Sequence, residues 1–321
     1  MKSKVTPLLV ALLIASTLCE PNRAQSSDRF IRNDASLQTS IKENYITVEK
    51  LRMRYVESGK GSTVVMIHGN AGSIEDFEFG AIETLSSNYR VMAVERPGHG
   101  KSDRPNGKTD VEYQARLLHQ MLSSLGVAQP VLVGHSWGAA LALSYALQYP
   151  TEVSALILVS PAAYPDAGEG RLLQAINKPP IIGDVPLMLG HSFLGRHILK
   201  GILRRAFSPQ PLPERYFRLV ASSWLGRKQL KAYLEDESSL NASLRKISKR
   251  YSEINIPVVI LTGDHDQIVS PRENAYRLKD SIANSQLIEL KDTGHEIPQT
   301  HPESISNALS LINSSIAAVM H

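Results

Sequence analysis

The stretch Gly134-His135-Ser136-Trp137-Gly138 decides the fold. It follows residues 130–133, a short apolar and β-branched run that is typical of a buried parallel strand. It precedes residues 139–147, which are rich in helix-forming residues. Glycines on both sides of the serine allow a sharp turn between strand and helix, which leaves the hydroxyl exposed. The pattern predicts that Ser136 is a nucleophile, and an ordinary strand-to-helix turn is the alternative.

Outward from this turn, strands and helices alternate along the chain. Apolar or alternating runs predict strands at 46–48, 51–56, 63–67, 90–94, 130–133, 155–159, 257–262 and 286–290. Helices are expected at 74–85 with Ser73 as N-cap, at 110–125 with Asp110 as N-cap, at 139–147, at 271–283 and from about 302. The first two strands are expected to be antiparallel. The alternation predicts an α/β fold, a mostly parallel twisted sheet with helices on both faces and right-handed crossovers.

Residues 161–250 interrupt this alternation. No buried strand is expected there, and helix-like pieces lie at 191–206, 213–225 and 227–246. We interpret the segment as a helical cap (lid) inserted into a core made of residues 45–160 and 251–321. It holds fifteen Lys and Arg against seven Asp and Glu. Solvated helix faces explain this charge, and a surface for anionic lipid headgroups or acidic substrates is the alternative.

Residues 1–24 have the pattern of a signal peptide or N-terminal anchor. Lys2 and Lys4 precede the apolar residues 5–18, a run shorter than the roughly 20 residues of a transmembrane helix. Cleavage after Cys19 or Ala24 is expected, with an uncleaved anchor or a lipid on Cys19 as alternatives. Residues 25–44 are interpreted as a linker. The leader predicts an exported protein, secreted or periplasmic, and a membrane-anchored one is the alternative.

Composition excludes several classes of protein. A formal net charge of +4 over 321 residues gives no nucleic-acid signature. The sequence Gly100-Lys101-Ser102 resembles the end of a phosphate-binding loop, but Glu95 stands where that loop needs its first glycine. There is no zinc-ligand spacing, and the chain has a single cysteine. We therefore expect neither a metal nor a cofactor.

A serine nucleophile needs a base, usually a histidine that a carboxylate orients. The strand ending at 262 is followed by Asp264 and Asp266, and the strand ending near 290 is followed by His295. Because the carboxyl ends of parallel strands meet at one edge of the sheet, these side chains are expected near Ser136. Their chain order of serine, aspartate and histidine is the order used on this kind of sheet.

The other histidines have no such position. His135 is expected to point along the turn, and His68 is expected to bond the backbone of its loop. Surface or capping roles are expected for the remaining ones, namely His99, His119, His191, His197, His265, His301 and His321.

With these motifs the chain resembles the α/β-hydrolase superfamily, in the serine-nucleophile, esterase/lipase-like branch with a helical cap after the sixth strand. The resemblance runs from about residue 45 to the C-terminus. It rests on His68-Gly69, the loop 96–102, the Gly134 to Gly138 turn, Gly263 to Asp266, and Gly294-His295. Glu95 stands where the family often has aspartate.

The resemblance implies catalytic roles for Ser136, Asp266 and His295, with Asp264 as the alternative acid. It implies an oxyanion hole formed by the backbone N–H groups of Asn70 and Trp137. Asn70 also resembles the halide-binding asparagine of haloalkane dehalogenases, but those enzymes attack with an aspartate. The Asn70 side chain is expected to stabilise its own loop. Trp137 is expected either to line the substrate pocket or to pack under the cap.

The expected activity is hydrolysis of a carboxylic ester through an acyl-enzyme, as in a carboxylesterase or lipase. Alternatives are hydrolysis of a carbon–carbon bond, lactone or amide, perhydrolysis, or a ligand receptor that retains the three residues. The expected partner is a small ester or lipid-like molecule, with peripheral membrane contact through the basic cap. No nucleic acid and no obligate protein partner is expected.

Overall fold

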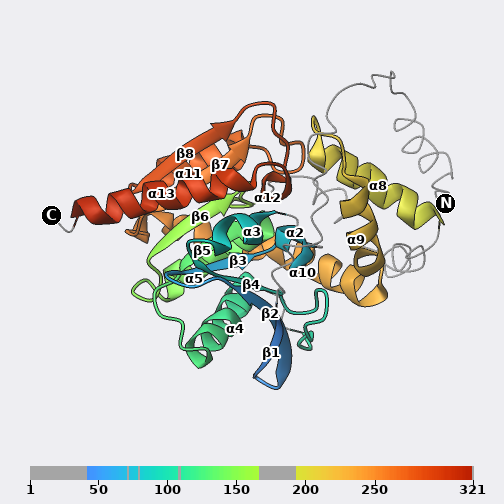
Figure 1. Ribbon diagram of the computed structural model, residues 1–321, viewed down its shortest axis with the longest axis horizontal. Coiled ribbons are helices and arrows are strands. Elements are labelled where there is room, and N and C mark those ends of the chain that lie inside the picture. The colour runs from blue at the N-terminus through green and yellow to red at the C-terminus, as the bar shows by residue number, and fades with distance from the viewer. Residues whose placement is uncertain (1–41, 71, 79, 108–109, 166–192, 320–321) are drawn as a thin grey trace, which may run out of the picture. The chain divides into compact units, whose positions relative to one another are not determined.

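The computed structural model describes residues 42–319 except 71, 79, 108–109 and 166–192. Its strands form one eight-stranded sheet in the order β1-β2-β4-β3-β5-β6-β7-β8 (Figure 1). The strands are β1 (Lys42–Val48), β2 (Leu51–Ser58), β3 (Thr63–Ile67), β4 (Arg90–Val94), β5 (Val131–His135), β6 (Ala155–Val159), β7 (Val258–Gly263) and β8 (Ser285–Leu290). β2 pairs antiparallel with β1 and β4, and the other pairs are parallel. The predicted fold class is confirmed.

Helices cover both faces of the sheet, because alternate strand residues point to opposite sides. Val65 and Ile67 of β3 pack in the apolar cluster that holds the buried faces of α4 (Val111–Ser124) and α5 (Trp137–Gln148). Val64 and Met66 pack in the opposite cluster with α2 (Glu75–Glu78), α3 (Ala81–Ser86) and α13 (Pro302–Val319). Because the central strands are buried on both faces, their sequences are continuous apolar runs.

Within the described residues, three α-helices lie between β6 and β7, close to the predicted positions. They are α8 (Phe193–Phe207), α9 (Glu214–Trp224) and α10 (Arg227–Ile247), followed by the short helix η2 (Ser248–Glu253). α8 and α9 share an apolar cluster that includes Leu203, Phe207, Tyr216 and Val220. The division into core and cap stays a prediction. The expected leader (1–24) and most of the expected linker (25–44) lie outside the described residues.

Two helix predictions need correction. The single helix expected over 74–85 is wrong, because α2 and α3 are separate helices. Gly80 between them has φ of 158°, far from helical geometry. The helix expected over 271–283 begins as the π-helical turn η3 (Arg272–Tyr276) and continues as α11 (Arg277–Ser281). The short helix α12 (Ile297–Thr300) was not predicted, because four residues are too few to show a helical period.

The turn between β5 and α5 depends on its glycines. A Cβ atom on Gly138 would clash with the carbonyl oxygens of Ile67 and His68, which belong to β3 and the loop after it. A Cβ on Gly134 would clash with the backbone at the start of α5. Only glycine therefore allows β3, β5 and α5 to approach this closely.

We expect Gly138→Ala to lower the free energy of unfolding by about 1–3 kcal/mol, because the carbonyl groups in its way are backbone and cannot rotate aside. Urea unfolding followed by circular dichroism measures the change. Gly201→Ala is the control. This position lies inside α8 with open space around it, so alanine is expected to stabilise by about 0.5–1 kcal/mol. A Gly138→Ala protein as stable as the wild type would contradict the prediction.

Candidate active site

Ser136 occupies the turn that the sequence predicts, directly after β5. Its φ of 53° and ψ of −116° are unusual for a residue with a side chain, and this backbone strain is typical of functional turns. Its backbone N–H donates to the Val159 carbonyl oxygen at 2.9 Å, which ties the turn to the end of β6. The residue is partly exposed, whereas its neighbours His135 and Trp137 are buried.

Asp266 and His295 are brought together from the loops after β7 and β8. The His295 Nδ1 donates to Asp266 Oδ2 at 2.7 Å, and both residues are buried. Asp266 Oδ1 accepts the backbone N–H groups of Ile268 at 2.8 Å and Val269 at 2.9 Å. Asp264 is exposed and instead pairs with His265. The geometry therefore selects Asp266 as the partner of His295.

The backbone of His295 is fixed from three sides. Its N–H donates to the Ala206 carbonyl oxygen of α8 at 2.8 Å. Its carbonyl oxygen accepts from His135 Nε2 at 3.1 Å and from Ser160 Oγ at 3.0 Å. The His135 and His295 rings lie 4.9 Å apart between centroids. Through His135, the loop that carries His295 thus contacts the turn that carries Ser136.

Charge and burial act in opposite directions on this pair. Burial acts to lower the pKa of His295, but the charge and hydrogen bond of Asp266 outweigh it and raise the pKa above the ordinary value. Burial acts to raise the pKa of Asp266, but His295 and the two amides hold it below the ordinary value. Burial and the neighbouring His295 lower the pKa of His135 to about 3, so His135 is neutral. Asp266 is therefore ionised and favours the imidazolium form of His295.

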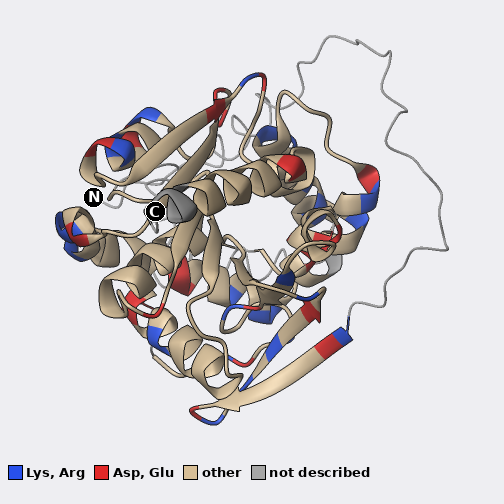
Figure 2. Ribbon diagram, turned by 60° about the vertical axis from the view of Figure 1, so that its left-hand side comes forward, with Lys and Arg blue, Asp and Glu red and all other residues tan. Residues whose placement is uncertain are grey.

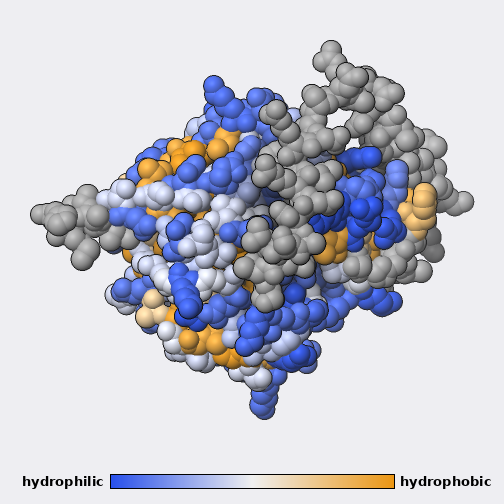
Figure 3. Space-filling model, viewed as in Figure 1, coloured by the Kyte–Doolittle hydropathy of each residue, from blue (hydrophilic) through white to orange (hydrophobic). Residues whose placement is uncertain are grey.

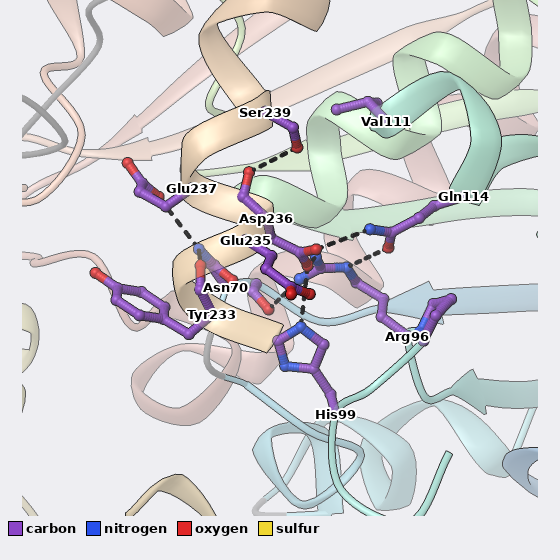
Figure 4. A network of polar contacts seen from close by, with 12 residues as sticks. Asn70, Arg96, His99, Val111, Gln114, Tyr233, Glu235, Asp236, Glu237 and Ser239 are labelled. Atoms are coloured by element: carbon purple, nitrogen blue, oxygen red, sulfur yellow. Dashed lines mark hydrogen bonds and ion pairs between the residues drawn. The ribbon is translucent and has the colours of Figure 1, made fainter. Parts of the chain in front are cut away.

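The loop after β3 lies against the Ser136 turn. A Cβ on Gly69 would lie 3.2 Å from the Ser136 Cβ, so the loop backbone approaches the serine closely. The Asn70 side chain was expected to stabilise its own loop, and the structure shows contacts of this side chain with another element. Its Nδ2 donates to the Tyr233 carbonyl oxygen at 3.2 Å and to Glu237 Oε2 at 3.1 Å, both in α10 (Figure 4).

Trp137 is almost completely buried, with 1% of its surface exposed. The Arg96 guanidinium lies 3.6 Å from the centroid of its ring. This contact favours a packing role for the ring, and substrate binding by Trp137 stays a prediction.

Two other histidines have structural roles. The expectation of a surface or capping role for His99 is wrong, because the ring is buried and donates from Nε2 to Asp236 Oδ2 at 3.0 Å. His68 bonds the backbone as predicted. Its Nδ1 donates to the Gly69 carbonyl oxygen at 2.8 Å, and its Nε2 accepts the Arg96 N–H at 3.0 Å.

Several residues of the site were missed by the sequence analysis. Ser160 directly follows β6, and that position at the shared strand edge was a signal that it borders the site. Ala206 and Asp236 carry no local signal, because they lie on helices whose packing the sequence does not show.

Basic and acidic residues both occur along the described helices, strands and loops (Figure 2). Exposed Phe193, Ile198 and Ile202 of α8 lie next to basic residues of the same helix, and Figure 3 shows orange and blue surfaces side by side in this region. Membrane contact stays a prediction. Among the described helices, none combines the length and apolar character needed to span a bilayer. Within the described residues, no group of three or more His, Cys, Asp or Glu is placed to hold a metal ion.

Comparison with known proteins identifies the class. The model of the alpha/beta hydrolase fold family matches residues 62–302, and the chain belongs to this family. The class is therefore a hydrolase, built on the sheet and loops described above.

Individual relatives differ in their activities. The chain is similar to Lipase 1 of Psychrobacter immobilis, with 26% identity over 85% of this chain and 83% of the lipase. It is equally similar, at 26% identity over 89% of this chain and 96% of the relative, to 2-hydroxy-6-oxononadienedioate/2-hydroxy-6-oxononatrienedioate hydrolase of Klebsiella pneumoniae. An alpha/beta hydrolase fold protein from Burkholderia ambifaria has a TM-score of 0.72 and 22% identity, covering 83% of this chain and 96% of that one. This last likeness supports the fold alone.

We expect Asp266→Asn to lower the pKa of His295. Without the carboxylate charge, the effect of burial, which disfavours the imidazolium, is unopposed. The wild-type ring should titrate above the ordinary histidine pKa of about 6.5, and the variant ring below the wild-type value. NMR titration of the His295 Cε1–H signal measures both. Asp264→Asn is the matched control and should leave the signal unchanged. A larger shift in the control would assign the partner role to Asp264.

Proposed function

We propose that this protein is a serine hydrolase that cleaves a carboxylic ester through an acyl-enzyme. The observation that carries the proposal is the buried Asp266–His295 hydrogen bond on a loop that His135 ties to the Ser136 turn. In this mechanism Ser136 Oγ attacks the ester carbonyl carbon while His295 Nε2 accepts its proton. Asp266 keeps the proton of the neutral ring on Nδ1, which leaves Nε2 free to act as the base.

The second half of the reaction uses the same groups. His295 returns the proton to the leaving alcohol, and a water molecule that His295 activates then hydrolyses the acyl-enzyme. The backbone N–H groups of Asn70 and Trp137 stabilise the oxyanion of each tetrahedral intermediate. The close approach of Gly69 to Ser136 supports this assignment. Loss of one such donor typically slows an enzyme by about 10²- to 10³-fold.

The substrate class is proposed as an ester with an apolar acyl or alcohol group. The similarity to the Psychrobacter lipase and the many Leu, Ile and Phe residues of α8 and α9 support it. Carbon–carbon bond hydrolysis is the second candidate, because the relative from Klebsiella is named as a hydrolase of a 2-hydroxy-6-oxo dioate. The same serine, histidine and aspartate would serve both reactions.

We expect the wild type to react with a fluorophosphonate probe and to hydrolyse p-nitrophenyl esters, and Ser136→Ala to lose both activities. The reason is that a serine is reactive toward the probe only when an adjacent base takes its proton. Labelling on a gel and a panel of esters of rising chain length measure the two properties. Ser310→Ala, on the outer face of α13, is the control and should retain full activity. Absence of labelling in folded wild type would overturn the proposal, and labelling with cleavage of a vinylogous diketone but no ester would favour the second candidate.

We also propose that the protein is exported, because residues 1–24 have the basic and then apolar pattern of a leader. When the full chain is expressed in a bacterial host, the mature protein is expected to begin after Cys19 or Ala24. Mass spectrometry of the intact protein, after cell fractionation, measures this. Full-length protein in the membrane fraction would instead support the anchor, and a lipid mass on Cys19 would support the lipoprotein.

A further inference from the structure

Arg96 lies in the loop after β4 and extends its side chain into a buried site between the sheet edge and α10 (Figure 4). Its Nη2 pairs with Asp236 of α10, and its Nε donates to Gln114 Oε1 at 3.3 Å. Its Nη1 donates to the Gly69 carbonyl oxygen at 2.8 Å. Its Cζ atom lies over the Trp137 ring, 3.6 Å from the ring centroid. One side chain thus contacts both segments that carry the proposed oxyanion donors.

The bond to Gly69 acts on a particular peptide group. The Gly69 carbonyl and the Asn70 N–H belong to the same peptide unit, which is planar and trans, so the two groups point in opposite directions. A donor that holds the oxygen therefore also fixes the direction of the N–H. Because the guanidinium is charged, its hydrogen bond also polarises the peptide group and makes the Asn70 N–H a stronger donor.

Asp236 holds the guanidinium in this position. The carboxylate is fully buried and also contacts His99 Nε2 at 3.0 Å, Gln114 Nε2 at 3.1 Å and Arg104 Nη2 at 2.7 Å. Both carboxylate oxygens of Asp236 make polar contacts that hold the carboxylate in place. The guanidinium of Arg96 therefore has a fixed partner. Gln229 of α10 adds a second link, because its Nε2 donates to the Gly72 carbonyl oxygen at 2.9 Å and its Oε1 accepts the Gly100 N–H at 2.7 Å.

We propose that Arg96 is a positioning residue for the oxyanion hole. It orients and polarises the Asn70 N–H through the Gly69 carbonyl, and it fixes the Trp137 segment by stacking on its ring. Asp236 of α10 anchors it, so the inserted helix contributes to transition-state stabilisation without touching the reacting atoms. This inference rests on the proposed function, because it assumes that these two N–H groups bind an oxyanion.

The test compares Arg96→Lys with Arg104→Lys. Lysine keeps the charge but cannot reach the carboxylate, the Gly69 oxygen and the Trp137 ring together, because it lacks the planar fork. Arg104 pairs with the same Asp236 and donates to the Pro97 carbonyl oxygen at 2.8 Å, but no contact with Gly69 or Trp137 is found for it among the described residues. With a p-nitrophenyl ester, we expect Arg96→Lys to lower kcat by about 10- to 100-fold with KM changed by less than about 3-fold. Arg104→Lys should remain within about 3-fold of wild type in both.

A second readout does not depend on activity. In protein labelled with ¹⁵N-asparagine, the Asn70 amide proton signal is assigned by its loss in Asn70→Ser. Arg96→Lys should shift this signal upfield, because the peptide is less polarised, and Arg104→Lys should leave it in place. If Arg96→Lys does not fold, Asp236→Asn takes its place. It removes the anchoring charge and should change kcat and the amide signal in the same direction.

The outcomes separate the two proposals. A lower kcat and a shifted Asn70 signal in the Arg96 or Asp236 variant, with neither effect in Arg104→Lys, support the positioning role. An unshifted Asn70 signal, an unchanged kcat, or equal losses in Arg96→Lys and Arg104→Lys overturn it. If the wild type hydrolyses no ester but the Asn70 signal still depends on Arg96 alone, the orientation of the peptide stands and the proposed function fails.

Discussion

Gly69 and Gly138 let the loop after β3 and the turn after β5 approach to van der Waals contact, and the rest of the site depends on that contact. A Cβ on Gly138 would collide with the Ile67 carbonyl oxygen, and a Cβ on Gly69 would lie tightly against the Ser136 Cβ at 3.2 Å. The turn also holds Ser136 at a positive φ. Because glycine has no Cβ, the two segments can approach this closely. The surrounding sheet offsets the backbone strain at Ser136.

A second constraint fixes the loop after β8. His295 is held at its ring by Asp266, at its N–H by Ala206, and at its carbonyl oxygen by His135 and Ser160. A histidine with all these groups occupied has little freedom to rotate, which preserves the direction of Nε2. One of these contacts comes from α8, so a helix outside the sheet contributes to the geometry of this histidine. The end of β5 and the loops after β6 and β7 provide the others.

Buried charge links α10 to the same region. Arg96 and Asp236 are both almost fully buried, and a buried ion pair is retained only if its hydrogen-bonding groups are satisfied. The groups that surround the pair, His99, Gln114 and Arg104, meet that condition for the carboxylate. The Gly69 carbonyl oxygen and Gln114 Oε1 meet it for the guanidinium. A buried ion pair therefore lies beside the segment that follows the serine.

The sequence by itself determined the strands, the Ser136 turn and the order of serine, aspartate and histidine, because side-chain period and turn chemistry are local properties. It failed at Gly80, where one residue outside helical geometry divides an expected helix, and it predicted a surface or capping role for His99, which is buried. Only the tertiary structure decided whether Asp264 or Asp266 bonds His295, because both follow the same strand end. It also decided the contacts of Arg96 with Asp236 and of His295 with Ala206. These partners are far apart in sequence, and their meeting depends on how α8 and α10 pack, which no local pattern encodes.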